Sequence, residues 1–274
     1  MGLLTIDESK CKKDGICVKE CPSGIIRLGG EETHPRVEPE DEIACSTCGH
    51  CVAVCPQGAL SHSRMPMEKC TAIKNELWID HEQAVQFLRS RRSARQFQDK
   101  PVEKDKILRL IEIARYAPTS GNTQLVEWVV FTDRNQLKEF SRLTVNYLRE
   151  MLREAPRSAI PPYVPRVVSA WDAGHDGVLR NAPVLILASA PREAVNGMVD
   201  LTLSMSYLDL AAPTLGLGTC WAGLLQRGLL QWPPLKEAFS LPDAHVHHFP
   251  MMLGYSKAKY YRLPERKPPR IDWR

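Results

Sequence analysis

The sequence predicts an α+β protein of two domains, in which a small cysteine-rich domain precedes a larger α/β sandwich domain. Seven of the nine cysteines fall within residues 11–55, whereas the later part consists of apolar runs with helix or strand periodicity. The charge divides in the same way. Residues 1–80 hold 9 Lys and Arg against 13 Asp and Glu, which leaves 27 against 19 in the remainder. We therefore expect a first domain at 1–63, a linker at 64–79 and a second domain at 80–274.

The first domain carries two cysteine runs. The second run reads C-x2-C-x2-C-x3-C-P, and the first repeats it with Asp14 in place of the second cysteine. Such a loop presents three thiolates to one iron–sulfur cube, while its fourth cysteine serves the other cluster, so two runs cross over. The predicted ligands of one [4Fe–4S] cluster are Cys21, Cys45, Cys48 and Cys51. Those of the other cluster are Cys11, Asp14, Cys17 and Cys55.

Asp14 distinguishes the two predicted clusters. A carboxylate is a harder and weaker ligand for iron than a thiolate, so its corner is expected to be labile. We predict either a [3Fe–4S] cluster or a [4Fe–4S] cluster with one iron held by Asp14 or solvent. An empty site with Asp14 facing solvent is the alternative. Zinc is the competing metal, but zinc sites need neither the third close cysteine nor the duplicated x3-C-P ending.

Residues 5–62 resemble a bacterial two-cluster ferredoxin. The resemblance includes a P-x-G-x-[IL] sequence after each cysteine run, beginning at Pro22 and Pro56. It implies two pseudo-symmetric α+β halves. The acidic insert between the runs is expected to be a solvated hairpin or loop, with a docking surface for a basic redox partner as the alternative. Its acidic residues are Glu31, Glu32, Glu38, Glu40, Asp41 and Glu42.

The other features favour a protein of the cytoplasm. Thiolates that hold iron need a reducing compartment, and the N-terminus lacks the pattern of a signal peptide. The most apolar long stretch, residues 198–217, contains Asp200 and Asp209, so it predicts a buried helix and no membrane span. Cys70 is expected to be a free thiol in the linker, and Cys220 a small buried apolar residue.

The second domain has the pattern of a sheet flanked by helices. Helices are expected at 80–92, where Asp80 and Gln83 have capping-box spacing, and at 103–118, 135–154 and 198–217, the last kinked at Pro213. Apolar runs predict strands at 126–132, 183–189, 219–223 and 247–255. A sheet of four or five strands follows. There is no G-x-G-x-x-G, so the sequence offers no dinucleotide site of that kind.

Arginines and a hydroxyl in "RSRRSARQF" (89–97) suit a monophosphate. With "ARYAPTSGNTQLVEWVV", "LGLGTCWAG" and "LGY…RLPER", this motif makes residues 80–274 resemble the nitroreductase family of FMN enzymes. The resemblance implies an intertwined homodimer with two FMN sites. It implies contacts with the FMN phosphate and ring edge from Arg91, Arg92, Ser93 and Arg95, and with the partner's flavin from Pro118, Thr119, Ser120, Asn122 and Gln124. It places Ala222 and Gly223 near the reactive flavin nitrogen, and either Arg262 or Arg266 at the phosphate.

Two segments leave alternatives open. Residues 156–175 contain four prolines and cannot form one long helix. They are either a lid over the flavin, with Tyr163 and Trp171 as substrate contacts, or a surface loop. The histidines of "HVHH" (His245, His247 and His248) could mark a metal site, although an ordinary strand entrance is the simpler interpretation.

The combined pattern predicts an FMN-dependent oxidoreductase of the nitroreductase type. Iron–sulfur clusters would relay electrons to flavin and then to an electron-poor small molecule, a nitroaromatic or quinone. Because the cofactor carries the reaction, no catalytic side chain is predicted. The expected donor is a low-potential ferredoxin or NAD(P)H. The alternatives are an electron-transfer protein serving a redox partner, and a dehalogenating or flavin-fragmenting branch of the fold. The basic excess is not gathered in long runs, so no nucleic-acid partner is expected.

Overall fold

The computed structural model describes residues 2–30 and 33–274. The chain divides into two compact units, Met1–Trp78 with Gly121–Thr123, and Ile79–Ser120 with Gln124–Arg274. The predicted start of the second domain at residue 80 lies beside the division between Trp78 and Ile79.

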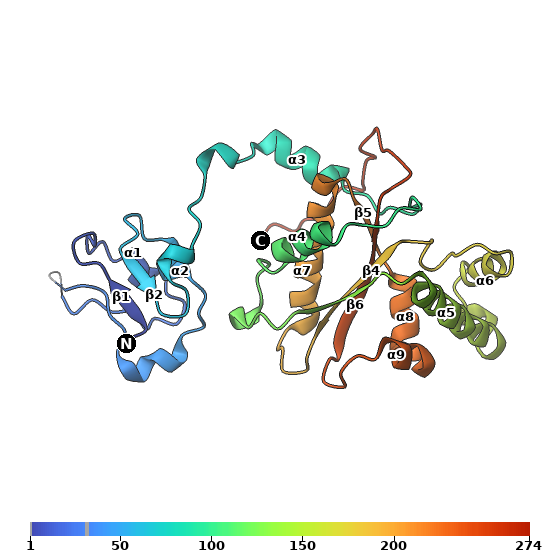
Figure 1. Cartoon of the computed structure of the whole chain (residues 1–274), viewed down its shortest axis with the longest axis horizontal. Helices are drawn as coiled ribbons and strands as arrows, with labels where there is room; N and C mark the ends of the chain where they lie inside the picture. The colour runs from blue at the N-terminus through green and yellow to red at the C-terminus, as the bar shows by residue number, and fades with distance from the viewer. Residues whose placement is uncertain (1, 31–32) are drawn as a thin grey trace. The chain divides into compact units, whose positions relative to one another are not determined.

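The first unit is a small α+β body (Figure 1). Strands β1 (Leu4–Ile6) and β2 (Leu60–His62) pair in antiparallel fashion, and the short helices α1 (Ile16–Lys19) and α2 (His50–Ala53) contact each other. The core is formed by apolar side chains and cysteines from both halves, among them Leu3, Ile25, Ile26, Val52 and Leu60. The 3-10 turns are Pro39–Ala44, Met67–Lys69 and Asn75–Leu77.

The two halves of this unit repeat one backbone frame. Each residue of α1 has a counterpart in α2 at one constant spacing along the chain. The three cysteines of the first run have counterparts in the second run at the same spacing. The repeat extends to backbone angles: Gly15 and Gly49 have φ of 70° and 76°, and Lys13 and Thr47 have 56° and 54°. Glycine adopts such angles without the steric cost that other residues bear. The pseudo-symmetry implied by the sequence is therefore present in the backbone.

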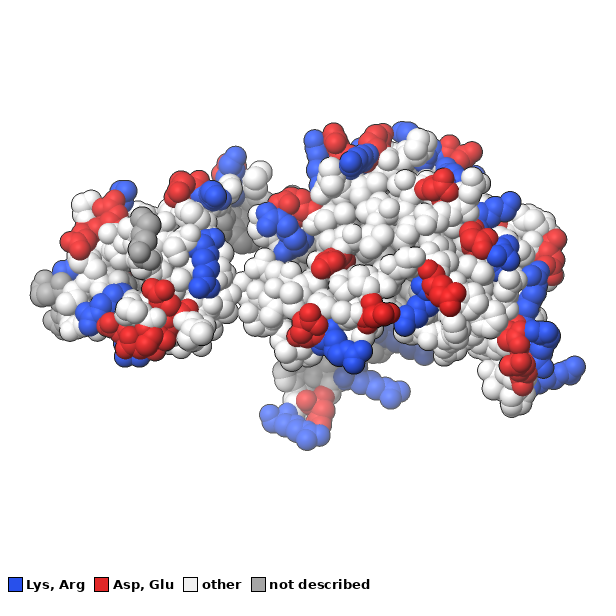
Figure 2. Space-filling view, turned by 60° about the horizontal axis from the view of Figure 1, so that its bottom comes forward, with Lys and Arg blue, Asp and Glu red and all other residues white. Residues whose placement is uncertain are grey.

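The acidic insert is more ordered than a solvated loop. Its residues 39–44 form a 3-10 turn. Asp41 pairs with Arg27 at 2.7 Å, Glu38 pairs with Arg36 at 2.8 Å, and Glu42 accepts a hydrogen bond from the backbone N–H of Leu3 at 2.9 Å. Figure 2 shows acidic side chains gathered on a face of this unit. The antiparallel bridge between Arg27 and Arg36 agrees with the expected hairpin, whereas residues 39–44 form a 3-10 turn. Glu31 and Glu32 lie outside the described residues.

In the second unit, a four-stranded antiparallel sheet lies between two layers of helices (Figure 1). The strand order is β3 (Glu127–Phe131), β4 (Val184–Ala190), β6 (His247–Gly254) and β5 (Gly218–Trp221). The helices are α3 (His81–Ser90), α4 (Lys104–Ala114), α5 (Arg134–Glu154), α6 (Val164–Asp172), α7 (Gly197–Ala211), α8 (Gly223–Gln231) and α9 (Pro233–Phe239). Further 3-10 turns lie at Ser120–Asn122, Arg157–Ala159 and Ala212–Leu215.

The alternation of strand side chains builds two cores. Every residue of β4 is buried. Its Ile186 packs in the cluster that contains residues of α4 and α7, whereas its Leu187 packs in the cluster with residues of α5, α8 and α9. Fully burying such a side chain contributes roughly 1.5–3 kcal/mol, so β4 contributes to the core on both faces of the sheet.

The helices depart from the sequence predictions at two prolines. Residues 156–175 form a 3-10 turn and then α6, so they are not one long helix, as expected, but the alternative of a simple surface loop misses α6. Pro165 lies in the first turn of α6, where a missing N–H costs nothing. Near Pro213, α7 ends at Ala211 and the chain continues as a 3-10 turn, which differs from the predicted kink within one helix.

Helix α3 shows the predicted capping box: the Asp80 side chain accepts from the Gln83 backbone N–H, and the Gln83 side chain accepts from that of Asp80. Its apolar face, however, has no buried residue in this chain. Leu88 is 56% exposed. The predicted helix is therefore present, and its apolar face is left open by the rest of the chain.

Candidate functional sites

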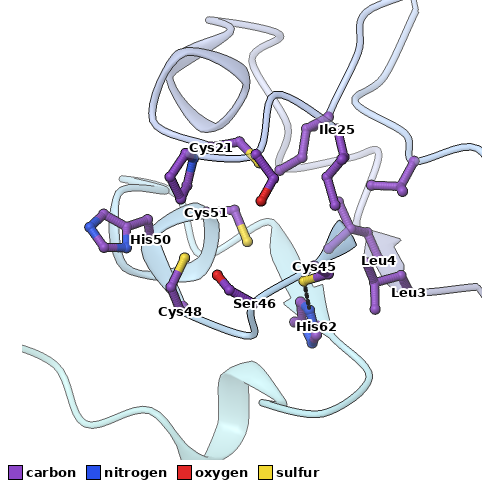
Figure 3. A pocket seen from close by; sticks show the side chains of 15 residues that line it. Leu3, Leu4, Cys21, Ile25, Cys45, Ser46, Cys48, His50, Cys51 and His62 are labelled. Carbon is purple, nitrogen blue, oxygen red and sulfur yellow. Dashed lines mark hydrogen bonds between the residues drawn. The ribbon is translucent and has the colours of Figure 1, made fainter. Parts of the chain in front are cut away.

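The first candidate site is a cavity lined by all four cysteines predicted for one cluster. Cys45, Cys48 and Cys51 come from the second run and Cys21 from the first. Figure 3 shows them around one opening, with His62 beside Cys45. The loop before α2 supplies the first two, and α2 itself supplies Cys51. The structure therefore brings together the side chains that the crossing rule groups.

The second candidate site has the other predicted set. Cys11, Asp14, Cys17 and Cys55 line one cavity with apolar residues from both repeats. Asp14 is exposed, and its carboxylate accepts a hydrogen bond from the backbone N–H of Ile16 at 3.1 Å. The ligand position that Asp14 occupies in place of a cysteine is thus open to solvent.

Burial affects two of the thiols strongly. It raises the pKa of the Cys51 thiol to about 11, and it also raises the pKa of Cys17, with Asp14 adding to the effect. A thiolate is unfavourable in such a place unless a cation lies next to it. Binding of iron would therefore displace the thiol protons. The donor set, soft sulfur with one carboxylate, fits iron–sulfur clusters.

Several donors point at the thiols. The backbone N–H of Thr47 lies 3.4 Å from Cys45 Sγ, and that of Ala59 lies 3.2 Å from Cys55 Sγ. His62 Nε2 lies 3.4 Å from Cys45 Sγ. The cysteine motifs do not reveal His62, although a comparison of the two repeats shows a histidine in one and Leu28 in the other.

The histidines near β6 are engaged in other contacts. His245 Nδ1 lies 2.9 Å from the hydroxyl oxygen of Ser189, and His248 Nδ1 lies 3.3 Å from Gln226 Oε1. Burial lowers the pKa of His248, with the nearby charges of Lys236 and His247 adding to it. Within residues 2–30 and 33–274, no group of three or more His, Cys, Asp or Glu is arranged to hold a single metal ion.

The third candidate site is a basic cavity of about 440 Å³ in the second unit. Its lining contains every residue predicted from the first motif and, from the tail, Arg266. The lining residues are Arg91, Arg92, Ser93, Arg95, Pro264, Glu265, Arg266 and Lys267. Arg262, the other candidate, is not among them. Several guanidinium groups and a hydroxyl at one opening suit a phosphate monoester.

A buried carboxylate supports this cavity from behind. Asp209 of α7 lies 3.6 Å from the guanidinium of Arg91 and accepts hydrogen bonds from the Thr219 hydroxyl and, at 3.2 Å, the Trp221 indole N–H. Its side chain is 7% exposed. Because Thr219 and Trp221 lie on β5, Asp209 ties Arg91 to the sheet. This role of Asp209 is not predicted from the sequence, because its ion-pair partner Arg91 lies far away in the chain and the contact depends on the fold.

The loop after α4 is fixed by a second acidic residue of α7. Asp200 accepts a hydrogen bond from the Ser120 backbone N–H at 3.0 Å, and the Gln124 backbone N–H donates to the Thr119 hydroxyl at 3.0 Å. Pro118 is exposed at the start of this loop. Asn122 has φ of 55° and belongs to the segment grouped with the first unit, so it is not placed with the others.

The remaining predicted residues lie at the end of β5 and in α6. Ala222 is 2% exposed and its backbone N–H donates to the Pro250 carbonyl, while Gly223 begins α8. Trp171 packs against the core that contains residues of α5 instead of standing free. The Tyr163 hydroxyl accepts a hydrogen bond from Arg227 at 2.9 Å. The two aromatic residues are thus held by their own unit.

None of the described helices is both long enough and apolar enough to cross a bilayer. This agrees with the expectation for α7, which keeps Asp200 and Asp209 buried in the protein.

Comparison with known proteins covers both units. Residues 9–60 match the 4Fe–4S dicluster domain. An Archaeoglobus fulgidus protein, provisionally named an NADH dehydrogenase/NAD(P)H nitroreductase, is 25% identical over 193 residues, covering 69% of this chain and 97% of its own.

Two solved structures share the fold of the second unit. A Bacteroides fragilis nitroreductase with bound FMN has a TM-score of 0.54 at 19% identity, covering 68% of this chain and 95% of its own. A BluB-like flavoprotein of Clostridium difficile has a TM-score of 0.54 at 21% identity, covering 70% and 96%. The nitroreductase family model matches residues 88–255. With a ferredoxin-type dicluster domain in front, the chain belongs to the nitroreductase family.

Proposed function

We propose that the protein is an FMN-dependent oxidoreductase that passes electrons through two iron–sulfur clusters to flavin and then to an electron-poor small molecule. The observation that carries the proposal is the sorting of eight predicted ligands into two cavities of four, in a chain that also has a basic cavity whose arginines suit a phosphate. A module that handles single electrons is thereby joined covalently to one that suits a flavin.

The cluster sites support two different cofactors. The all-cysteine cavity suits a [4Fe–4S] cluster held by Cys21, Cys45, Cys48 and Cys51. The cavity with Asp14 suits a [3Fe–4S] cluster, or a [4Fe–4S] cluster whose fourth iron is held by Asp14 or solvent. The exposure of Asp14 supports this assignment, because solvent reaches the corner.

The basic cavity supports binding of the FMN phosphate. Arg91, Arg95 and Arg266 would donate charge-assisted hydrogen bonds, and Asp209 orients Arg91. Bound FMN supplies the chemistry, since it takes electrons singly or as a pair. The protein's part is to hold the phosphate and present the ring edge at the end of β5, where Ala222 and Gly223 lie.

The acceptor is proposed to be a nitroaromatic or quinone. The name of the Archaeoglobus relative supports NAD(P)H as one donor. The dicluster domain supports a low-potential donor, a reduced ferredoxin, as the other.

We also propose that the working form is a homodimer. Apolar side chains that the chain itself leaves exposed support a second copy as their cover: Leu88 of α3 is 56% exposed, Val199 of α7 57% and Trp273 of the tail 88%. The tail after β6 is exposed and has no regular structure of its own. Light scattering after gel filtration should give a mass near twice 30.9 kDa. A monomer that retains FMN would contradict the dimer.

The experiment for the whole proposal is anaerobic purification followed by FMN and iron analysis. Stopped-flow reduction by NADH, NADPH and reduced ferredoxin then follows flavin and cluster absorbance separately. We expect reduced ferredoxin to bleach the clusters before the flavin, and Cys48→Ser to slow flavin reduction by this donor. Equal flavin reduction in the wild type and Cys48→Ser, with clusters remaining oxidised, would contradict the relay. Absence of FMN from the purified protein would contradict the flavin assignment.

A further inference from the structure

We propose that His62 donates a hydrogen bond to the Cys45 thiolate and thereby raises the reduction potential of the cluster held by Cys21, Cys45, Cys48 and Cys51. The proposal rests on the cluster assignment above and goes beyond it, because it names a side chain outside the cysteine motifs that makes the two clusters unequal.

The geometry fixes which ring nitrogen carries the proton. The backbone N–H of Arg64 donates to His62 Nδ1 at 3.0 Å. A neutral imidazole whose Nδ1 accepts must carry its proton on Nε2. That nitrogen lies 3.4 Å from Cys45 Sγ. The ring is therefore held as a donor pointing at the sulfur.

The surroundings favour a strong effect of this contact. His62 is 2% exposed, at the end of β2, and its strand partner is Leu4. Leu3 and Leu4 line the same cavity. In such apolar surroundings a hydrogen bond to a charged group is electrostatically stronger than in water. Adding an electron increases the negative charge on the cluster and its thiolates, so a donor at Cys45 stabilises the reduced state more than the oxidised one.

The repeat makes the effect specific to one cluster. His62 occupies the position that Leu28 occupies in the first half, as Cys45 corresponds to Cys11. A leucine side chain has no N–H to donate. The second half has a further side-chain donor: the Arg64 guanidinium donates to the Thr47 hydroxyl at 3.2 Å. Arg64 corresponds to Gly30 in the first half.

The test is an EPR-monitored redox titration of the anaerobic full-length protein. His62→Leu copies the first repeat and removes the donor. We expect it to lower the reduction potential of the all-cysteine cluster. At a given solution potential the ratio of reduced to oxidised cluster should fall by up to about tenfold, which corresponds to ~59 mV for one electron. His62→Gln keeps an N–H donor of similar reach, so its cluster should have a reduction potential close to that of the wild type. His81→Leu is the control for the loss of a histidine, because exposed His81 lies on α3 and lines neither cluster cavity, and it should leave the reduction potential unchanged.

A second measurement detects the hydrogen bond in the wild-type protein. Pulsed EPR of protein labelled with 15N-histidine should show a 15N coupling to the reduced all-cysteine cluster, and His62→Gln should abolish it. Equal potentials in the wild type and His62→Leu would overturn the proposal. So would an equal shift in His62→Leu and His62→Gln, because packing would then account for it. Wild-type protein without iron would instead contradict the cluster assignment, and iron analysis separates that failure from the first two.

Discussion

Arg91 and Asp209 form an ion pair at the edge of the basic cavity, with 3.6 Å between guanidinium nitrogen and carboxylate oxygen. The carboxylate is almost fully buried, and its other contacts are to side chains of β5. Asp209 therefore acts on a ligand in the cavity through Arg91.

Asp209→Ala is expected to reduce both stability and FMN affinity. It leaves the Trp221 indole N–H and the Thr219 hydroxyl without their acceptor, which costs about 1–3 kcal/mol of unfolding free energy. Arg91 also loses its anchor. Denaturant unfolding of the flavin-free protein and fluorescence titration with FMN measure the two effects. Asp209→Asn, which retains an acceptor, should lose less stability. A stable Asp209→Ala variant with unchanged FMN affinity would show that Arg91 needs no anchor.

Arg266→Ala should weaken FMN binding and Arg262→Ala should not. Only Arg266 of this pair lines the basic cavity. Loss of a hydrogen bond to a charged group costs about 1.5–3 kcal/mol, or roughly ten- to a hundredfold in affinity. Riboflavin, which has no phosphate, should bind both variants as it binds the wild type. A stronger effect of Arg262→Ala would reverse the assignment.

Asp14→Cys should convert the solvent-facing corner into a fourth thiolate site. We expect the oxidised wild-type protein to show a [3Fe–4S] EPR signal, or its reduced form to show a cluster with a labile iron. The variant should show two [4Fe–4S] clusters and a higher iron content. Two unperturbed all-cysteine-like clusters in the wild type would contradict a role for Asp14.

Acid should destabilise the second unit through His248. Burial lowers the pKa of this side chain in the folded protein, so the unfolded chain takes up the proton first as the pH falls. The free energy of unfolding should therefore decrease below about pH 6.5, the ordinary value for histidine, until the pH passes the lowered pKa. Thermal midpoints of the full chain between about pH 8 and 5 measure this. His248→Gln should flatten the dependence, whereas His81→Gln, an exposed control on α3, should not.

The cysteine cavities could be predicted because their determinants are local. Spacing within a loop decides which way each thiol points, so the spacing alone assigns Cys21 and Cys55 each to the cluster of the other run. His62 could not be found in this way, since its contact with Cys45 depends on the pairing of β2 with β1. The choice of Arg266 over Arg262 likewise depends on the path of a tail without regular structure.

The helices show the same division between local and distant causes. The capping box of α3 follows from Asp80 and Gln83 alone. Helix α6 is not predicted when the prolines of residues 156–175 are taken as helix breakers, although a proline in the first turn, such as Pro165, is compatible with a helix. An amphipathic pattern reports only that one face of α3 is apolar. It does not tell whether that face is covered within the chain, and in the proposed dimer a second molecule would cover it.

The matching backbone frames of the two ferredoxin halves make each half an internal reference for the other. Gly15 and Gly49, and also Lys13 and Thr47, have matching left-handed conformations, so the backbones of the two cysteine runs agree at these positions. Around the cysteine runs the clearest differences between the halves are side chains, namely Asp14 against Cys48 and Leu28 against His62. Exchanging those pairs one at a time would transfer the character of one half to the other within a single molecule.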